Sequence, residues 1–213
     1  MSRERSYSAY TLDALLDAFA SNATVPGGGS ASALAGATGV ALLIMVASMR
    51  QAGATAASGD LAAAAARLGP LRDVLTSLID RDSDAYTAVI DTLRLPKGTD
   101  AEANVRRQAF ESAMREATDA PLEVMRACGR ALADALIVAA QGRRSAASDV
   151  GVAIELLRAA VRGASMNVDT NLSALKDTAY VDRVTAEQQR LGEQSAADAE
   201  RALALLTRPS GRS

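Results

Sequence analysis

The sequence predicts an all-α protein, folded as an antiparallel bundle of six to seven helices. Alanine, the residue with the highest helix propensity, supplies 48 of the 213 residues, whereas aromatic residues supply only 3%. Five prolines leave room for long helices. The breaks between the helical stretches are short, and short loops favour antiparallel neighbours. We therefore expect a single domain over residues 1–213, with a loose tail at 207–213.

The first amphipathic helix is expected over residues 11–21. Thr11 suits its N-cap, and Asp13 lies in the first turn, where a negative charge is favoured. Its apolar residues fall on one helical face: Leu12, Leu15, Leu16 and Phe19. The glycine-rich segment 26–29 then separates this helix from the next one.

The second helix, from about 30 to 54, is apolar on nearly every side, which is typical of a helix at the centre of a bundle. Residues 31–49 carry no charge and are long enough to span a membrane. Their alanine, glycine, serine and threonine content favours a buried helix instead, and we expect no membrane contact. The excess of small-residue helix surface also predicts self-association, most simply as a twofold homodimer.

Proline, glycine and capping residues mark the remaining boundaries. Pro70 either kinks the third helix or begins its second segment, and Pro121 suits the first position of a fifth helix. The expected ranges are 60–95, 100–118, 121–141, 147–172 and 177–206.

The charged and reactive residues of the chain argue against several classes of function. With 23 basic and 25 acidic residues, the chain has no excess of positive charge to favour nucleic-acid binding. The absence of histidine removes histidine-ligated metal sites and histidine-based catalysis, so acid–base chemistry falls to carboxylates, lysine, tyrosine or water. We expect no metal site. The lone Cys128 and the lack of an apolar signal segment fit a cytoplasmic protein.

A run of three glycines precedes the second helix: Gly27, Gly28 and Gly29, followed by Ser30. Glycine backbone allows N–H groups to converge on a ligand, and a helix N-terminus adds unpaired donors and partial positive charge. We interpret this loop as ligand-binding, with Ser30 as the capping residue. A flexible hinge is the alternative.

Asp82 is the candidate general acid or base. It points about 200° round the helix from Asp80, so it can face inward when Asp80 and Asp84 face solvent. Burial would then raise its pKa and suit it to proton transfer. The alternative is a solvated acidic surface. Lys97 follows a proline in the next turn and is a candidate amine, although a solvent-facing side chain is the ordinary expectation.

The third candidate cluster lies near the two ends of the predicted helix 147–172. Ser148 and Asp149 are at its start, and Asp149 can simply be an N-terminal cap. Asn167 and Asn171 are one turn apart on the same face. Their amides either bind a ligand or tie neighbouring helices together.

Together these segments resemble the cyclodeaminase/cyclohydrolase family of folate one-carbon metabolism. The matching stretches are 26–49, beginning PGGGSASAL; 82–97, ending LRLPK; 119–135; and 148–172, beginning SDVGVA. The resemblance implies a helical homodimer with a folate-binding groove at or near the dimer interface. It implies a reaction at the one-carbon unit bridging N5 and N10 of tetrahydrofolate, with no cofactor beyond the tetrahydrofolate derivative that is the substrate.

The resemblance also implies roles for the candidate residues. The glycines and Ser30 would shape the ligand loop, with Asp82, Lys97 and Asp149 as catalytic residues. The other ligand contacts would be Ser148, Asn167 and Asn171. Segments 50–55 and 142–145 depart from the family pattern. These departures keep two alternatives open: a diverged member that binds a folate or pterin-like ligand for another reaction, and a non-catalytic helical dimer.

Overall fold

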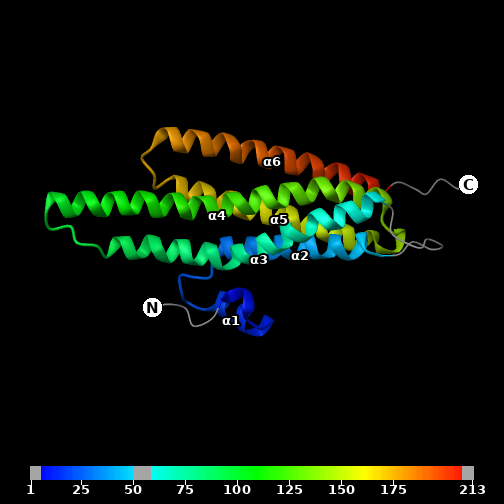
Figure 1. Ribbon diagram of the computed structural model, residues 1–213, viewed down its shortest axis with the longest axis horizontal. Helices are drawn as coiled ribbons and strands as arrows, with labels where there is room; N and C mark the ends of the chain where they lie inside the picture. Colours follow the sequence, from blue (N-terminus) through cyan, green and yellow to red (C-terminus); the bar gives the residue numbers. More distant parts are fainter. Residues whose placement is uncertain (1–5, 50–58, 208–213) are drawn as a thin grey trace, which may run out of the picture.

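The computed structural model describes residues 6–49 and 59–207, and this part of the chain is entirely helical, without strands (Figure 1). Two short 3-10 turns, Tyr7–Ala9 and Arg144–Ala146, accompany six α-helices. The helices are α1 Leu12–Ala20, α2 Gly28–Ala47, α3 Gly59–Leu93, α4 Asp100–Gln141, α5 Ala147–Leu172 and α6 Thr178–Thr207. The all-α prediction is confirmed.

Helices α2 to α5 form an up-and-down bundle, so the predicted antiparallel arrangement is also confirmed (Figure 1). Helix α6 packs along α4 and α5. The ion pair Arg126–Glu187 joins it to α4, and Arg115 of α4 pairs with Asp177, the residue just before α6. Helix α1 stands apart from the bundle. The α3–α4 hairpin extends beyond the ends of α2 and α5, because these two helices are the longest in the described chain.

Helix α2 lies at the centre of the bundle, as its apolar sequence predicts. A Cβ atom on Gly36 would lie 2.7 Å from the Cys128 sulfur, and one on Gly39 would lie 2.9 Å from the Ala153 carbonyl oxygen. Only glycine permits these close approaches. Although α2 is long and apolar enough to cross a membrane, 56% of its most apolar window is buried against the rest of the protein.

Two predicted boundaries of α2 are wrong. The helix begins at Gly28, with Gly27 as its N-cap, so Ser30 lies inside the first turn and does not cap it. The helix ends at Ala47, before the predicted end near residue 54. The altered segment 50–55 lies outside the described residues. Of the predicted tail at 207–213, Thr207 is still part of α6 and residues 208–213 lie outside the described residues.

The prediction of separate helices at 100–118 and 121–141 is also wrong, because α4 runs unbroken through Pro121. Proline has no N–H to donate to the carbonyl four residues earlier, which here belongs to Ala117. The side-chain amide of Asn171 donates to that carbonyl at 2.7 Å. A tertiary hydrogen bond therefore replaces the missing helical one. Helix α3 likewise continues through Pro70.

Candidate active site

A hollow of about 260 Å³ opens where α2 begins, between α3, α4 and α5. Its walls include the three glycines Gly27, Gly28 and Gly29, together with Asp82, Asn167 and Asn171. Segments far apart in the sequence, each singled out by its residue types, therefore meet at one place. Its remaining lining residues are Thr24, Val25, Tyr86, Ala117 and Thr170.

Asp82 faces inward from α3 onto the start of α2. The buried Ser30 hydroxyl lies 3.0 Å from the Asp82 carboxylate, and it is also within hydrogen-bond distance of the Ile79 carbonyl and the Ser83 hydroxyl. The Ser30 backbone N–H also donates to Asp82. The first N–H groups of a helix have no acceptor within the helix, and the N-cap Gly27 has no side chain to supply one. The Asp82 carboxylate supplies an acceptor at this end of α2 instead.

Gly29 leaves the space that the Asp82 carboxylate occupies. A Cβ atom at position 29 would lie 2.0 Å from Asp82 Oδ1 and 2.5 Å from its carboxyl carbon. At Gly28 a Cβ atom would approach the Asn167 amide nitrogen at 3.4 Å, which is ordinary contact. The central requirement for glycine in this loop is therefore the close approach of Asp82 to Gly29.

Burial raises the pKa of Asp82 above the ordinary value for aspartate. The hydrogen bonds from Ser30 act in the opposite direction and offset only part of this rise. A half-buried carboxyl group with a raised pKa, beside a ligand-sized hollow, can both accept and donate a proton.

The two asparagines have different partners. Asn167 donates to the Gly163 carbonyl of its own helix at 2.8 Å, whereas Asn171 donates across to Ala117 on α4. Asn171 therefore does tie neighbouring helices together. Both side chains also line the hollow. An asparagine amide carries an acceptor oxygen besides its NH2 donor, so each residue can still accept a hydrogen bond.

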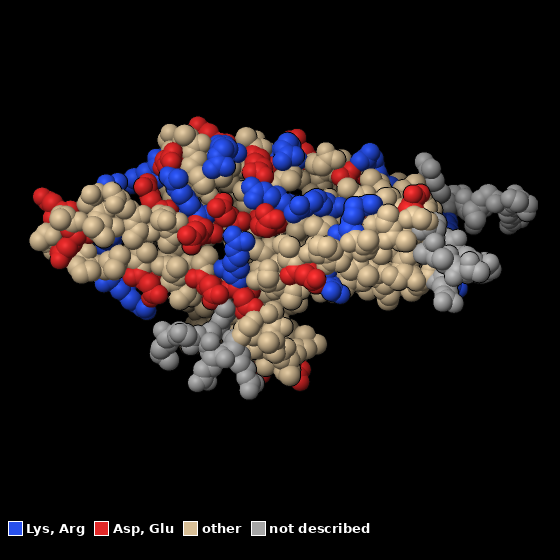
Figure 2. All heavy atoms as spheres, viewed as in Figure 1, with Lys and Arg blue, Asp and Glu red and all other residues tan. Residues whose placement is uncertain are grey.

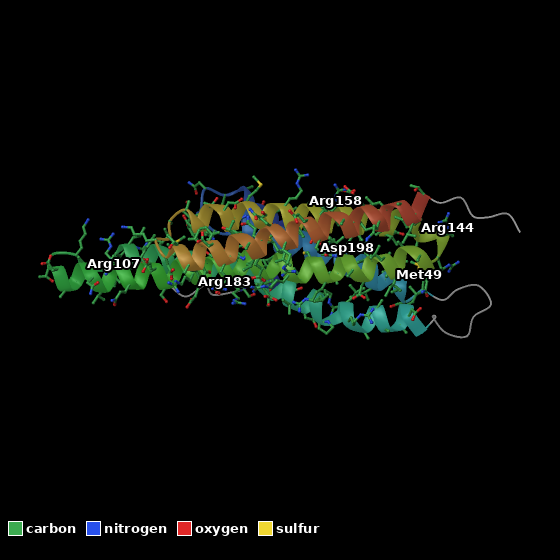
Figure 3. The ribbon with its side chains drawn as sticks, turned by 90° about the horizontal axis from the view of Figure 1, so that it is seen from above. Met49, Arg107, Arg144, Arg158, Arg183 and Asp198 are labelled. Atoms are coloured by element: carbon green, nitrogen blue, oxygen red, sulfur yellow. The ribbon has the colours of Figure 1, made fainter. Side chains whose placement is uncertain are left out.

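The structure does not bring Lys97, Ser148 or Asp149 to this hollow within one chain. Lys97 lies beyond the end of α3. The last residue of that helix, Leu93, is about 16 Å from Asp82 along the helix axis, so Lys97 lies outside the hollow. Asp149 lies in the first turn of α5, about 27 Å along that axis from Asn167. Figure 3 shows Arg107, near the α3–α4 tip, and Arg144, just before Ser148, at opposite ends of the molecule.

Asp80 has a role that the sequence analysis missed. Its carboxylate accepts hydrogen bonds from the Tyr7 backbone, at 2.6 Å, and from the side chains of Ser6 and Ser8. Burial alone would raise the pKa of Asp80, but these hydrogen bonds outweigh it and lower the pKa. The Tyr7 hydroxyl in turn donates to the Val25 carbonyl at 3.2 Å. Asp80 thus anchors the N-terminal segment beside the glycine loop. The sequence around Ser6 and Ser8 contains no motif that predicts this contact with a residue more than 70 positions away.

Among the described residues, no group of three or more histidine, cysteine, aspartate or glutamate side chains is placed to hold a metal ion. Cys128 is a buried free thiol within the core, and burial raises its pKa to about 12. The titratable group at the hollow with a perturbed pKa is therefore Asp82.

Fold and site together define an all-helical protein with a carboxylate at a ligand-sized hollow. A family model described as formiminotransferase-cyclodeaminase matches residues 11–190. Methenyltetrahydrofolate cyclohydrolase of Methylorubrum extorquens is 36% identical over 183 residues, which is 85% of this chain and 88% of that protein. The chain belongs to the formiminotransferase-cyclodeaminase family, a family of enzymes.

Two further comparisons agree with this assignment. Formimidoyltransferase-cyclodeaminase of Rattus norvegicus is 32% identical over 81% of this chain, and the match spans 33% of that protein, about a third of its length. The crystal structure of formiminotetrahydrofolate cyclodeaminase from Thermotoga maritima superposes with a TM-score of 0.83 at 22% identity. The superposition covers 93% of this chain and 96% of the other, and it shows a shared fold.

Proposed function

We propose that this chain acts on the one-carbon unit between N5 and N10 of tetrahydrofolate, and that its reaction is the hydrolysis of 5,10-methenyltetrahydrofolate. The observation that supports this most directly is the raised pKa of Asp82 at a hollow rich in amides and backbone donors. The cyclohydrolase of M. extorquens matches over nearly the full length of both proteins, which favours hydrolysis.

In this reaction Asp82 moves protons at the methenyl carbon. As base, its carboxylate takes a proton from the water that adds to the cationic carbon. As acid, it returns that proton to N5 while the bond from carbon to N5 breaks. The hydroxyl proton is released and the formyl group stays on N10. The products are 10-formyltetrahydrofolate and one proton, so atoms and charge balance.

Cyclisation of 5-formimidoyltetrahydrofolate is the second candidate, favoured by the 32% identity to the rat enzyme. There N10 attacks the carbon of the protonated formimidoyl group. Asp82 would take the N10 proton and deliver it to the departing amino group, which leaves as ammonia. The product is the 5,10-methenyltetrahydrofolate cation, so atoms and charge balance. Both reactions pass through a tetrahedral carbon, so one positioned carboxylate serves either of them.

The asparagines would recognise the pterin ring. A pterin presents N–H donors along one edge, and the side-chain amides of Asn167 and Asn171, which line the hollow, would accept from them through their oxygens. Gly27 and Gly28 would let the ring approach the backbone closely. Catalytic roles for Lys97 and Asp149, and a contact from Ser148, would require a second copy of the chain at this hollow.

We also propose a homodimer that works in the cytoplasm. Helix α1 supports self-association because Leu12 and Leu16 are 67% and 53% exposed on its surface. In Figure 2 the α1 region is largely uncharged, whereas charged side chains crowd along α4 and α6. A second copy of the chain would cover this apolar surface.

Absorbance assays test the proposed reactions. Methenyltetrahydrofolate absorbs in the near ultraviolet, whereas its hydrolysis product does not absorb there. Loss of this absorbance faster than in buffer supports hydrolysis. Its appearance from formimidoyltetrahydrofolate, with release of ammonia, supports cyclisation. If neither substrate reacts faster with purified protein than without it, the proposed function is wrong.

A further inference from the structure

A second hollow, of about 350 Å³, lies on the α3–α4 hairpin near its tip. Its walls combine apolar and cationic side chains from both helices and the turn between them: Leu93, Ala103, Phe110, Lys97, Arg106 and Arg107. Figure 3 shows Arg107 at this end of the molecule. Three cations beside a phenyl ring suit a ligand that is both aromatic and anionic.

Helical geometry places this hollow on the same face as the active-site hollow. On α4, Phe110 and Arg106 precede Ala117 by seven and eleven residues, so both lie within about 20° of its direction. On α3, Leu93 follows Asp82 by eleven residues and shares its face for the same reason. Asp82 and Ala117 line the first hollow, and Leu93 and Phe110 line the second. From this shared helical face we infer that the two hollows are parts of one groove.

The cations of the second hollow form no ion pair with any residue that the structure describes. Within the described chain, neither Lys97 nor Arg106 forms an ion pair, and Arg107 donates to the neutral Asn104 side chain at 2.5 Å. The nearby Glu102 carboxylate accepts from the backbone N–H groups of Gly98 and Thr99 instead. The cationic groups of Lys97, Arg106 and Arg107 are therefore not engaged in ion pairs with described residues.

We propose that the groove holds the p-aminobenzoyl-glutamate part of the substrate. Its ring would pass Tyr86 toward Phe110, and its glutamate carboxylates would meet Arg106, Lys97 and Arg107. This inference rests on the proposed function, since it assumes a folate in the first hollow. It gives Lys97 a place in ligand binding that does not require contact with Asp82.

The length of this ligand fits the groove. Ala117 and Phe110 are about 10 Å apart along the α4 axis. With ordinary bond lengths, N10 and the first glutamate α-carboxylate are also about 10 Å apart when the molecule is extended. Arg106 lies about 6 Å further along, within reach of the glutamate γ-carboxylate.

Two substrates and one substitution test the proposal. The first substrate is methenyltetrahydrofolate, and the second is its analogue in which a neutral methylamide replaces glutamate. For the wild-type protein, KM is expected to be at least tenfold higher for the analogue. Arg106→Gln should raise KM for the folate about tenfold and change KM for the analogue less than twofold. Lys97→Gln, in the turn outside the helices, should act in the same direction.

Arg72→Gln is the matched control, because Arg72 is an exposed arginine of α3 that pairs with Asp73 outside the groove. It should leave both KM values unchanged. Equal KM values for the two substrates in the wild-type protein, or an equal rise for both in Arg106→Gln, would overturn this inference and leave the proposed function intact. Absence of turnover with either substrate in the wild-type protein would overturn both.

Discussion

Asp82 meets two demands with one carboxylate. It accepts hydrogen bonds from the first turn of α2, and it is half-buried at the rim of the hollow. The hydrogen bonds favour the ionised carboxylate, whereas burial favours the neutral carboxyl group. Burial is the larger effect, so the pKa of Asp82 is raised. A group balanced in this way is easily both protonated and deprotonated, as proton transfer requires.

Replacing the carboxylate by an amide should remove this chemistry. We expect Asp82→Asn to lower kcat at least tenfold with the fold intact, because the amide cannot carry the proton. Asp73→Asn, at an exposed aspartate of the same helix, should not change kcat. In the wild-type protein, activity should fall as pH decreases through the raised pKa of Asp82, since protonation removes the base. Full activity of Asp82→Asn would exclude this residue from the mechanism.

Although Asp82→Asn should lower activity, it should raise the stability of the folded protein at neutral and higher pH. Because the pKa of Asp82 is raised on folding, this group favours the folded state most below the ordinary aspartate pKa of about 3.9, and that contribution is lost as pH rises through the raised pKa. Asp82→Asn should therefore raise Tm at pH 8 and give little gain near pH 4. Thermal melts at the two pH values measure this difference. An equal shift at both would contradict the assigned pKa direction.

Gly29 is the position where a single methyl group should disturb the site. In Gly29→Ala the new Cβ would overlap Asp82, so we expect kcat/KM to fall at least tenfold and the free energy of unfolding to fall by ~1–3 kcal/mol. Gly192→Ala is the control, since nothing lies within 4 Å of a Cβ at that helical position. It should raise stability by about 0.5–1 kcal/mol. Similar effects of the two substitutions would contradict the close contact.

At the scale of the helices, Pro121 and Asn171 form one unit. The proline leaves the Ala117 carbonyl without its helical donor, and the asparagine of α5 supplies another. This bond joins α4 to α5 at the wall of the hollow, so the same side chain holds the helices together and faces the ligand site.

A double-mutant cycle tests this pairing. Asn171→Ala should cost ~1–3 kcal/mol in the wild-type background, because a buried carbonyl loses its partner. In the Pro121→Ala background the restored N–H can serve that carbonyl, so the cost should be smaller by at least about 0.5 kcal/mol. Denaturant unfolding of the four proteins gives the coupling energy. If the free-energy changes of the two single substitutions simply add up in the double variant, the Asn171 amide does not replace the helical N–H that Pro121 lacks.

At the scale of the whole molecule, the exposed apolar face of α1 predicts assembly. Sedimentation should give twice the chain mass of 21.9 kDa. Exchanging Leu12 and Leu16 for Gln should shift the protein toward monomer without changing the Tm of the monomer, since both side chains are already exposed there. A wild-type monomer at micromolar concentration would contradict the proposed dimer. An undiminished dimer in the double variant would show that α1 is not its interface.

Much of the fold followed from local pattern. Alanine content and apolar periodicity identified the helices, and the glycine loop, Asp82 and the asparagines were each singled out by residue type. The predicted break at Pro121 is wrong because the hydrogen bond that compensates for the proline comes from Asn171, fifty residues further along the chain. The predicted capping role of Ser30 is wrong because its hydrogen bond to α3 has no local signal in the sequence.

Helix propensity and apolar periodicity act between near neighbours, so they are enough to define the helical class of this protein and its available chemical groups. Which of these groups meet depends on tertiary packing. The direction and register of packed helices set the distances between remote residues. They place Asp82 against Gly29 and Asn171 against Ala117, while Lys97 and Asp149 stay apart from them within one chain.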